Sequence, residues 1–198
     1  MRMNRWMLAR LGKAGAALHE GLDAFRFDDA TGALYHFFWG ELCDWYLEQA
    51  KPIFNGEDEA AKNETRDTLA YVLEASLRAL HPFIPFITEE LWQRVPKPTG
   101  SPVSIALASL PTAAAGPSDD AAEAEMATVH AVVGAARTIR SERDVHPGAT
   151  VPLVLRSDDE AVRALLEEER ISIETLVKTD SLTIEASGGD RPRGAALS

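Results

Sequence analysis

The chain has 198 residues, 45% of them hydrophobic, which is enough for one large domain or two small ones with a proper core. No apolar run approaches the roughly 20 residues of a membrane-spanning helix, and the N-terminus lacks a signal-peptide block, so we expect a soluble cytoplasmic protein without a membrane partner. A single cysteine excludes an internal disulfide framework and any multi-cysteine metal site. The formal net charge of −11 disfavours sequence-blind binding of nucleic acid, because such a chain repels phosphates.

Residues 1–27 differ from the remainder in charge. Five basic groups against two acidic ones give this segment +3, which leaves −14 for the rest of the chain. We predict a first helix over residues 3–23, in which Gly12 and Gly15 each lower helix propensity by about 1 kcal/mol relative to alanine. The same Gly-Lys-Ala-Gly spacing matches the loop of KH-type RNA modules, but the surrounding sequence shows no strand pattern to complete such a module.

The stretch 33–52 concentrates large apolar side chains in one helix-length segment. Its main stripe, at helical spacing, consists of Leu34, Phe37, Phe38, Leu42 and Trp45. Tyr35, Trp39 and Tyr46 widen this stripe toward a second face. We therefore expect a helix covered on two sides, with Trp39 and Trp45 in the core.

Proline and capping residues delimit the neighbouring helices. Asp28 or Asp29 is expected to cap the tryptophan-rich helix and Pro52 to end it. The clearest amphipathic pattern follows over 59–80. Thr88 is expected to cap a short helix from Glu89 to about residue 95.

The proline-rich connection at 81–88 has two interpretations. Its aromatic density suggests a functional surface. A structural role is favoured, in which two prolines shape a tight connection and four apolar side chains plug the end of the bundle. These side chains are Phe83, Ile84, Phe86 and Ile87.

The second half of the chain has a different pattern. Proline, alanine, glycine and serine over 96–118 indicate a linker, and a helix is predicted over 119–143. Strands at 151–155 and 181–186 flank another helix, which begins at the capping box of 157–160. The predicted fold is mainly α, with a helical bundle at 1–97, a linker or covering loop at 98–118, a small α+β domain at 119–187 and a flexible tail at 188–198.

Five segments in this order resemble the C-terminal, anticodon-binding part of valyl-tRNA synthetases, which are class I aminoacyl-tRNA synthetases. They are NRWMLARL at 4–11, FRFDDA at 25–30, WGELCDWYLE at 39–48, LHPFIPFITEELW at 80–92, and IRSER with VHP at 139–147. The isoleucyl and leucyl enzymes share parts of this pattern. The DWYL sequence at 44–47 and the unbroken 80–92 segment favour the valyl family.

The resemblance implies an anticodon-binding helical bundle that recognises the anticodon arm of valine tRNA, with the catalytic domain of a parent synthetase as its other partner. The parent family uses ATP through a His-Ile-Gly-His type signature and a Lys-Met-Ser-Lys-Ser loop, and neither occurs in these 198 residues. We therefore expect no catalytic residues, no metal and no cofactor in this chain, with ATP implied only for a catalytic domain elsewhere. The alternative is a free-standing helical scaffold or protein-interaction module that has lost RNA recognition.

RNA contact requires basic groups for phosphates and exposed planar groups for unstacked bases. The preferred candidate site consists of Arg5, Arg10, Lys13, Phe25, Arg26 and Phe27. A second basic patch consists of Arg137, Arg140 and Arg143. The competing interpretations are a solvated basic face with two core phenylalanines for the first set, and cations that suit a helix C-terminus for the second.

Overall fold

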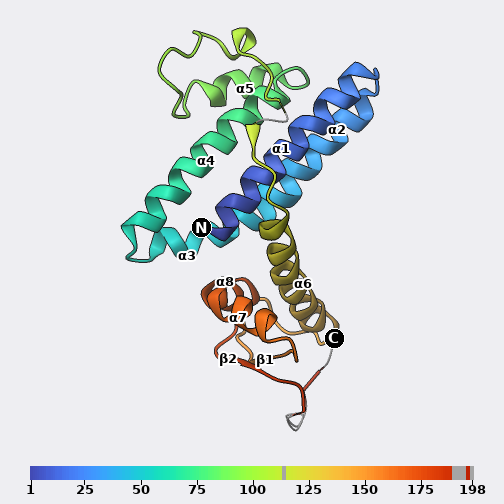
Figure 1. Ribbon diagram of the computed structural model, residues 1–198, viewed down its shortest axis with the longest axis vertical. Helices are drawn as coiled ribbons and strands as arrows, with labels where there is room; N and C mark the ends of the chain where they lie inside the picture. Colours follow the sequence, from blue (N-terminus) through green and yellow to red (C-terminus); the bar gives the residue numbers. More distant parts are fainter. Residues whose placement is uncertain (113–114, 189–194, 197–198) are drawn as a thin grey trace. The chain divides into compact units, whose positions relative to one another are not determined.

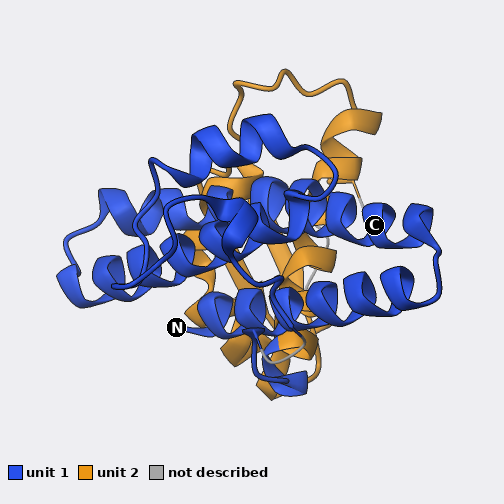
Figure 2. Ribbon diagram, turned by 90° about the horizontal axis from the view of Figure 1, so that it is seen from above, with its two compact units in different colours: residues 1–122 blue, residues 123–198 orange. Residues whose placement is uncertain are grey.

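The computed structural model describes residues 1–112, 115–188 and 195–196, in two compact units that consist of residues 1–122 and 123–198 (Figure 2). Its mainly helical architecture, with a bundle followed by a small α+β region, confirms the predicted fold class. Along the chain, the boundary between the two units falls within a helix, between residues 122 and 123. The exact domain boundaries drawn from the sequence stay a prediction.

The first unit is a bundle in which α1 packs side by side with α2 and against α4 (Figure 1). Its elements are α1 (Arg2–Asp23), α2 (Phe27–Tyr35), the π-helix η1 (His36–Tyr46), α3 (Leu47–Asn55), α4 (Glu59–Leu80), α5 (Pro85–Trp92) and the short 3₁₀ helix η2 (Ile105–Leu107). The helices predicted over 3–23 and 59–80 agree with α1 and α4. Asp58 caps α4, because its Oδ1 accepts a hydrogen bond from the Ala61 backbone N–H at 3.0 Å.

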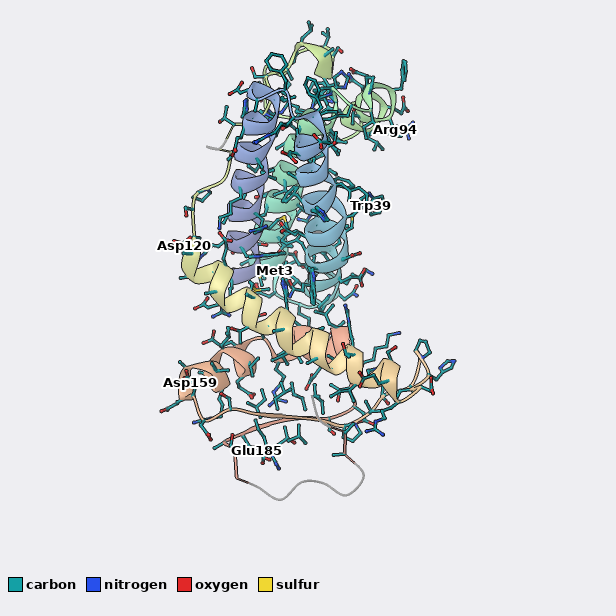
Figure 3. The ribbon with its side chains drawn as sticks, turned by 90° about the vertical axis from the view of Figure 1, so that its right-hand side faces the viewer. Met3, Trp39, Arg94, Asp120, Asp159 and Glu185 are labelled. Atoms are coloured by element: carbon teal, nitrogen blue, oxygen red, sulfur yellow. The ribbon has the colours of Figure 1, made fainter. Side chains whose placement is uncertain are left out.

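The tryptophan-rich segment is helical without interruption from α2 through η1 to α3, and its middle is π-helical. Leu34, Phe37 and Leu42 are buried as predicted, and Tyr46 is completely buried. Trp39, by contrast, is 54% exposed and projects away from the bundle (Figure 3), so its predicted core position is wrong. The reason is that Trp39 follows the buried Phe37 by two residues, which places the two side chains on nearly opposite sides of the helix.

Pro52 does not end this helix, contrary to the prediction. It lies inside α3, which continues to Asn55 and ends where Gly56 adopts an extended conformation. The missing N–H of proline removes one backbone hydrogen bond, but Gln49 and Ala50 are fully buried and hold this part of the helix in the bundle.

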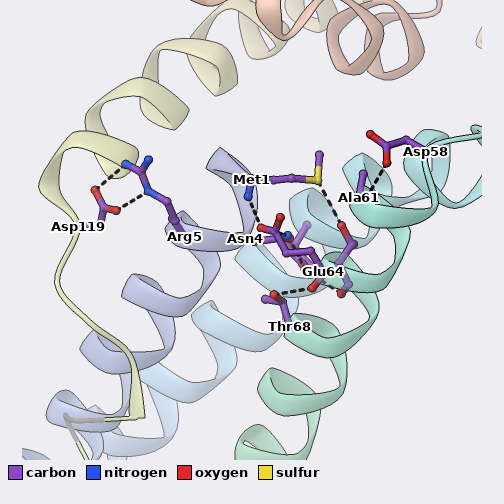
Figure 4. Close-up of polar contacts among 10 residues, drawn as sticks. Met1, Asn4, Arg5, Asp58, Ala61, Glu64, Thr68 and Asp119 are labelled. Atoms are coloured by element: carbon purple, nitrogen blue, oxygen red, sulfur yellow. Dashed lines mark hydrogen bonds and ion pairs between the residues drawn. The ribbon is translucent and has the colours of Figure 1, made fainter.

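Polar side chains tie α1, η1 and α4 together inside the bundle. The Tyr46 hydroxyl donates to Asn4 Oδ1 at 2.8 Å. Asn4 Nδ2 in turn donates to Glu64 Oε1 at 2.9 Å (Figure 4). Burial raises the pKa of Tyr46 well above its usual range, so the hydroxyl keeps its proton. The buried polar groups of Asn4 and Tyr46 are thus paired with each other and with Glu64.

The helix α5 begins at Pro85, four residues before the predicted start, because proline fits the first helical turn. Thr88 is a buried residue within the helix and not its cap; its hydroxyl lies 2.8 Å from His81 Nδ1. Trp92 is 1% exposed, and its Nε1 donates to Glu74 Oε1 at 2.9 Å. Arg78 Nε donates to the same carboxylate at 2.8 Å.

The predicted apolar plug at 83–87 is wrong for three of its four members. Ile84, Phe86 and Ile87 are 46%, 91% and 52% exposed, and only Phe83 packs partly against the core. The inner side of α5 is already filled by Thr88 and Trp92, which leaves the other apolar side chains outside.

The segment after α5 lies against the bundle and is held there by several contacts. Glu89 Oε2 accepts from the Ser104 hydroxyl at 2.7 Å, and Ile105 is buried beside Trp92. Farther along, Arg78 Nη1 donates to Ser109 O at 2.7 Å. The predicted covering loop is therefore attached to α4 and α5.

The second unit combines helices with a two-stranded parallel sheet. Its elements are most of α6 (Asp120–Glu142), β1 (Leu153–Arg156), α7 (Glu160–Glu168), α8 (Arg170–Val177) and β2 (Leu182–Glu185). The strands pair in parallel, with Leu153 opposite Leu182. Two helices replace the single predicted one between the strands, and Asp159 rather than Ser157 caps the first of them. The predicted flexible tail lies mostly outside the described residues.

Candidate nucleic-acid interface

The turn between α1 and α2, residues 24–26, carries an uncommon backbone conformation at Phe25. Its φ is 56°, in the left-handed region that favours glycine. Arg26 N donates to Gly21 O at 2.7 Å, and Phe25 N donates to Leu22 O at 3.1 Å, which is the hydrogen-bond pattern of a Schellman helix end. A bulky side chain at such a position costs about 1 kcal/mol or more relative to glycine.

The Phe25 side chain recovers little of this cost by packing. It is 80% exposed, and its one described ring partner is the neighbouring exposed Phe27, at 6.3 Å between ring centroids. Strain without compensating burial is a feature that points to function. The interpretation of these two residues as core phenylalanines is therefore wrong.

Arg26, which stands between the two phenylalanines in the sequence, forms ion pairs with two carboxylates. Its Nη2 lies 3.1 Å from Glu20 Oε1 and its Nε 3.1 Å from Asp29 Oδ2, while half of the side chain stays exposed. Exposed ion pairs of this kind contribute at most about 1 kcal/mol, so the guanidinium remains available to a phosphate that competes for it. The turn thus presents two aromatic faces beside a cation.

Gly21 lets α2 approach α1 just below this turn. A Cβ at this position would lie 2.9 Å from both the Cβ and the N of Ala30 and 3.0 Å from Arg26 O. We expect Gly21→Ala to lower the free energy of unfolding by about 1–3 kcal/mol, because the helices would have to move apart.

Urea denaturation followed by circular dichroism measures this change. Gly32→Ala, a glycine-to-alanine change within α2, is the control: a Cβ there meets nothing within 4 Å, and we expect a gain of about 0.5–1 kcal/mol. A neutral or stabilising Gly21→Ala would contradict the close approach of the two helices.

Arg5 and Arg10 are engaged by carboxylates of the bundle. Arg5 Nε donates to Asp119 Oδ2 at 2.7 Å (Figure 4), and Arg10 contacts both oxygens of Glu41 at 2.5–2.9 Å. Lys13 is exposed on α1. At 1.5 Å of rise per residue, Arg5 lies about 30 Å from the Phe25 turn, so the structure does not bring the predicted residues into one site. Arg26 alone among these basic residues lies at the turn.

The segment Gly12–Gly15 is part of α1 and both glycines are buried. A KH-type loop must be exposed to clamp a nucleic-acid backbone, so this interpretation is wrong.

The three arginines of the second basic patch lie at or near the C-terminal end of α6 and differ in their surroundings. Arg140 Nη2 donates to the carbonyl oxygens of His146 at 3.3 Å and Ala149 at 2.7 Å, which holds the turn after the helix. Arg137 Nε donates to Leu176 O at 3.2 Å, whereas Arg143 is exposed. Arg140 thus has the structural role that a cation near a helix C-terminus suggests.

Metal and histidine chemistry find little support in the residues that the structure describes. Among them there is no group of three or more His, Cys, Asp or Glu side chains placed to hold a metal ion. Burial lowers the pKa of His130 to about 4, which leaves it neutral at pH 7. No helix within the described ranges has the length and apolar content to cross a membrane.

Sequence reasoning missed the exposure of two aromatic side chains on the helix that follows the turn. Tyr35 and Trp39 are 61% and 54% exposed. Their apolar spacing suggested a second buried face, and nothing in the local sequence indicated that both side chains remain in solvent.

Comparisons with known proteins match this chain to a family of RNA-binding domains. Residues 4–155 match the anticodon-binding domain of tRNA ligase. A valine–tRNA ligase of Stenotrophomonas maltophilia (strain K279a) is 44% identical over 194 residues, 97% of this chain and 21% of that protein. Valine–tRNA ligases of Agrobacterium fabrum and Rhizobium meliloti are 40% and 38% identical, each over 98% of this chain and 20% of the relative. The chain thus spans about a fifth of the length of these relatives.

Proposed function

We propose, since the chain belongs to the family of anticodon-binding domains of tRNA ligases, that it binds the anticodon arm of a valine tRNA. The observation that carries this proposal is the strained and exposed Phe25 at the end of α1, with Phe27 and Arg26 beside it. An aromatic side chain kept in solvent at a conformational cost suits a ligand that supplies the missing contact.

The anticodon loop offers the complementary chemistry. Its unstacked bases have flat faces that stack on phenylalanine, and its phosphates attract a guanidinium. Stacking of one base on an aromatic side chain contributes about 1–3 kcal/mol. The net charge of −11 keeps non-specific phosphate binding weak, so stacking and shape account for most of the selectivity.

The chemical step belongs, in this proposal, to a different part of a valine–tRNA ligase. The relatives are about five times as long as this chain, and the signatures of ATP-dependent amino-acid activation do not occur in its sequence. The chain holds the tRNA in register, while a catalytic domain that uses ATP receives the acceptor end. Aminoacylation for translation places this work in the cytoplasm.

Phe25→Gly separates binding from stability. We expect this variant to bind a valine tRNA transcript about 10-fold to 100-fold more weakly, because one stacked base is lost. The free energy of unfolding should stay unchanged or rise by up to about 1 kcal/mol, because glycine relieves the left-handed conformation. Filter binding at moderate salt measures the first quantity and urea denaturation the second.

Phe86→Ala is the matched control, because Phe86 is a phenylalanine that is even more exposed but lies on α5. It should leave tRNA affinity unchanged. Equal retention of tRNA by the wild type and Phe25→Gly would show that the turn is not part of the binding site. Equal retention of valine tRNA and a non-cognate tRNA by the wild type would contradict the proposed specificity.

The alternative of a scaffold without RNA recognition draws on the ion pairs of Arg5 and Arg10, which occupy two of the predicted phosphate contacts. It requires that neither Phe25→Gly nor Arg26→Ala changes tRNA affinity. The two functions are therefore separated by the same binding assay.

A further inference from the structure

The five residues 115–119, which lead into α6, are fastened to the helices of the first unit, and we name them the clasp. The Tyr71 hydroxyl of α4 donates a hydrogen bond to Ala115 O at 2.7 Å. Gly116 lies directly against the backbone of α1, because a Cβ at this position would overlap the carbonyl oxygen of Leu8. Every residue larger than glycine would therefore push this part of the chain away from α1.

Asp119 ends the clasp and contacts two helices with one carboxylate. Its Oδ2 accepts a hydrogen bond from Arg5 Nε at 2.7 Å, and its Oδ1 accepts one from Arg5 Nη2 at 3.2 Å (Figure 4). The same Oδ1 also accepts from the Ala122 backbone N–H at 2.9 Å. Because Asp119 directly precedes α6, the bond to Ala122 is that of a helix N-cap, which supplies an acceptor to a first-turn N–H group.

Arg5 determines how this capping carboxylate is oriented. The guanidinium is a planar fork whose N–H groups match the two oxygens of a carboxylate. With both oxygens bonded to Arg5, the carboxylate plane is fixed and Oδ1 is held toward the Ala122 N–H. The hydrogen bond from Arg5 also holds the pKa of the Asp119 carboxyl below its usual range, so the cap is charged at neutral pH and suits the positive end of the helix dipole.

We propose that the clasp is a conformational coupling device, in which Arg5 of α1 positions Asp119 and thereby stabilises the first turn of α6. The coupling joins residues that are 114 positions apart in the sequence. It acts where the chain leaves the bundle, because α6 begins in the first unit and continues into the second. Arg5 is then a positioning residue, and release of the clasp from α1 and fraying of the first turn of α6 occur together. This proposal does not depend on the proposed tRNA binding.

Amide hydrogen exchange, measured by NMR on the whole chain, tests the coupling. Arg5→Ala should make the Ala122 amide exchange about 3-fold to 10-fold faster, because the capping carboxylate loses its fixed orientation. Asp119→Ala removes the cap itself and sets the upper limit of the effect. Arg5→Lys keeps the charge but not the planar fork, so its rate should fall between those of the wild type and Arg5→Ala.

Arg94→Ala is the matched control, because it breaks an exposed arginine–carboxylate pair on another part of the bundle. It should leave the Ala122 rate unchanged. The amide of Val72, which is completely buried on α4, reports whether the bundle as a whole is intact.

Gly116→Ala tests the close approach of the clasp to α1 independently of the ion pair. The added methyl group should displace the clasp and accelerate exchange at Ala122, again without an effect at Val72. Gly134→Ala, a change within α6 where a Cβ meets nothing within 4 Å, is its control and should not accelerate exchange at Ala122.

Two results would overturn the coupling. If Asp119→Ala accelerated exchange at Ala122 but Arg5→Ala left it at the wild-type rate, the cap would be local and α1 would have no part in it. If Arg5→Ala and Gly116→Ala both accelerated Val72 as much as Ala122, the effect would be a loss of stability of the whole bundle. Should only Arg5→Ala affect Val72, the rate at Ala122 in Gly116→Ala decides by the same criterion.

Discussion

Trp92→Ala should lower the free energy of unfolding of the first unit by about 3–5 kcal/mol, the largest loss we expect from a single substitution in this chain. Trp92 is 1% exposed, and it packs with Leu77 and Ile105. Lys97 Nζ lies 4.5 Å from the centre of its ring. Alanine would leave a cavity where α4, α5 and the covering loop meet. Urea denaturation followed by circular dichroism measures the loss.

Trp39→Ala is the matched control, because this tryptophan is 54% exposed on η1. Its removal should change stability by no more than about 0.5 kcal/mol, as is usual for surface positions. A loss as large as that of Trp92→Ala would show that Trp39 lies in the core after all, as its helical spacing first suggested.

Glu74→Ala is expected to cost about 2–3 kcal/mol, the second largest effect. The carboxylate is 6% exposed and accepts hydrogen bonds from Trp92 Nε1 at 2.9 Å and from Arg78 Nη2 at 2.9 Å. Its removal leaves a buried indole N–H without this acceptor and a partly buried guanidinium without its counter-ion. The expected value stays below that of a fully buried pair, because Arg78 is 20% exposed and also contacts Ser109 O.

Glu90→Ala removes the same chemical group from an exposed ion pair one helix away. The Glu90 and Arg94 side chains are 61% and 74% exposed, so solvent screens their attraction and the loss should not exceed about 0.5 kcal/mol. Comparable losses for the two glutamates, measured in the same denaturation assay, would argue against a buried network around Trp92.

The sequence by itself determined where the three longest helices, α1, α4 and α6, begin and end. The patterns over 59–80 and 119–143 correspond to α4 and α6, because caps, prolines and apolar periodicity act within one or two helical turns. The resemblance drawn from five short segments likewise agrees with the family match over residues 4–155. Helix bounds and short family segments are both local features of the sequence, so they can be identified without knowledge of the tertiary structure.

The apolar periodicity of the sequence did not predict correctly which side chains of η1 and α5 are buried. In η1 the spacing suggested that Trp39 and Tyr46 both lie on a second buried face, yet only Tyr46 is buried. On α5 Phe86 of the predicted plug is 91% exposed, whereas Trp92, on the inner side of the helix, is buried. A repeat in the sequence tells which side chains point the same way, but whether another element covers them depends on packing between distant segments.

The candidate site shows the same division. The sequence supplied two phenylalanines around an arginine and a row of basic residues on the first helix. Only the tertiary structure decided that Phe25 has a φ of 56° in solvent and that Arg10 is engaged by Glu41, 31 positions away. Contacts of this length depend on how helices pack against one another, and this packing is the reason why the turn, rather than the whole basic helix, is the surface we assign to RNA.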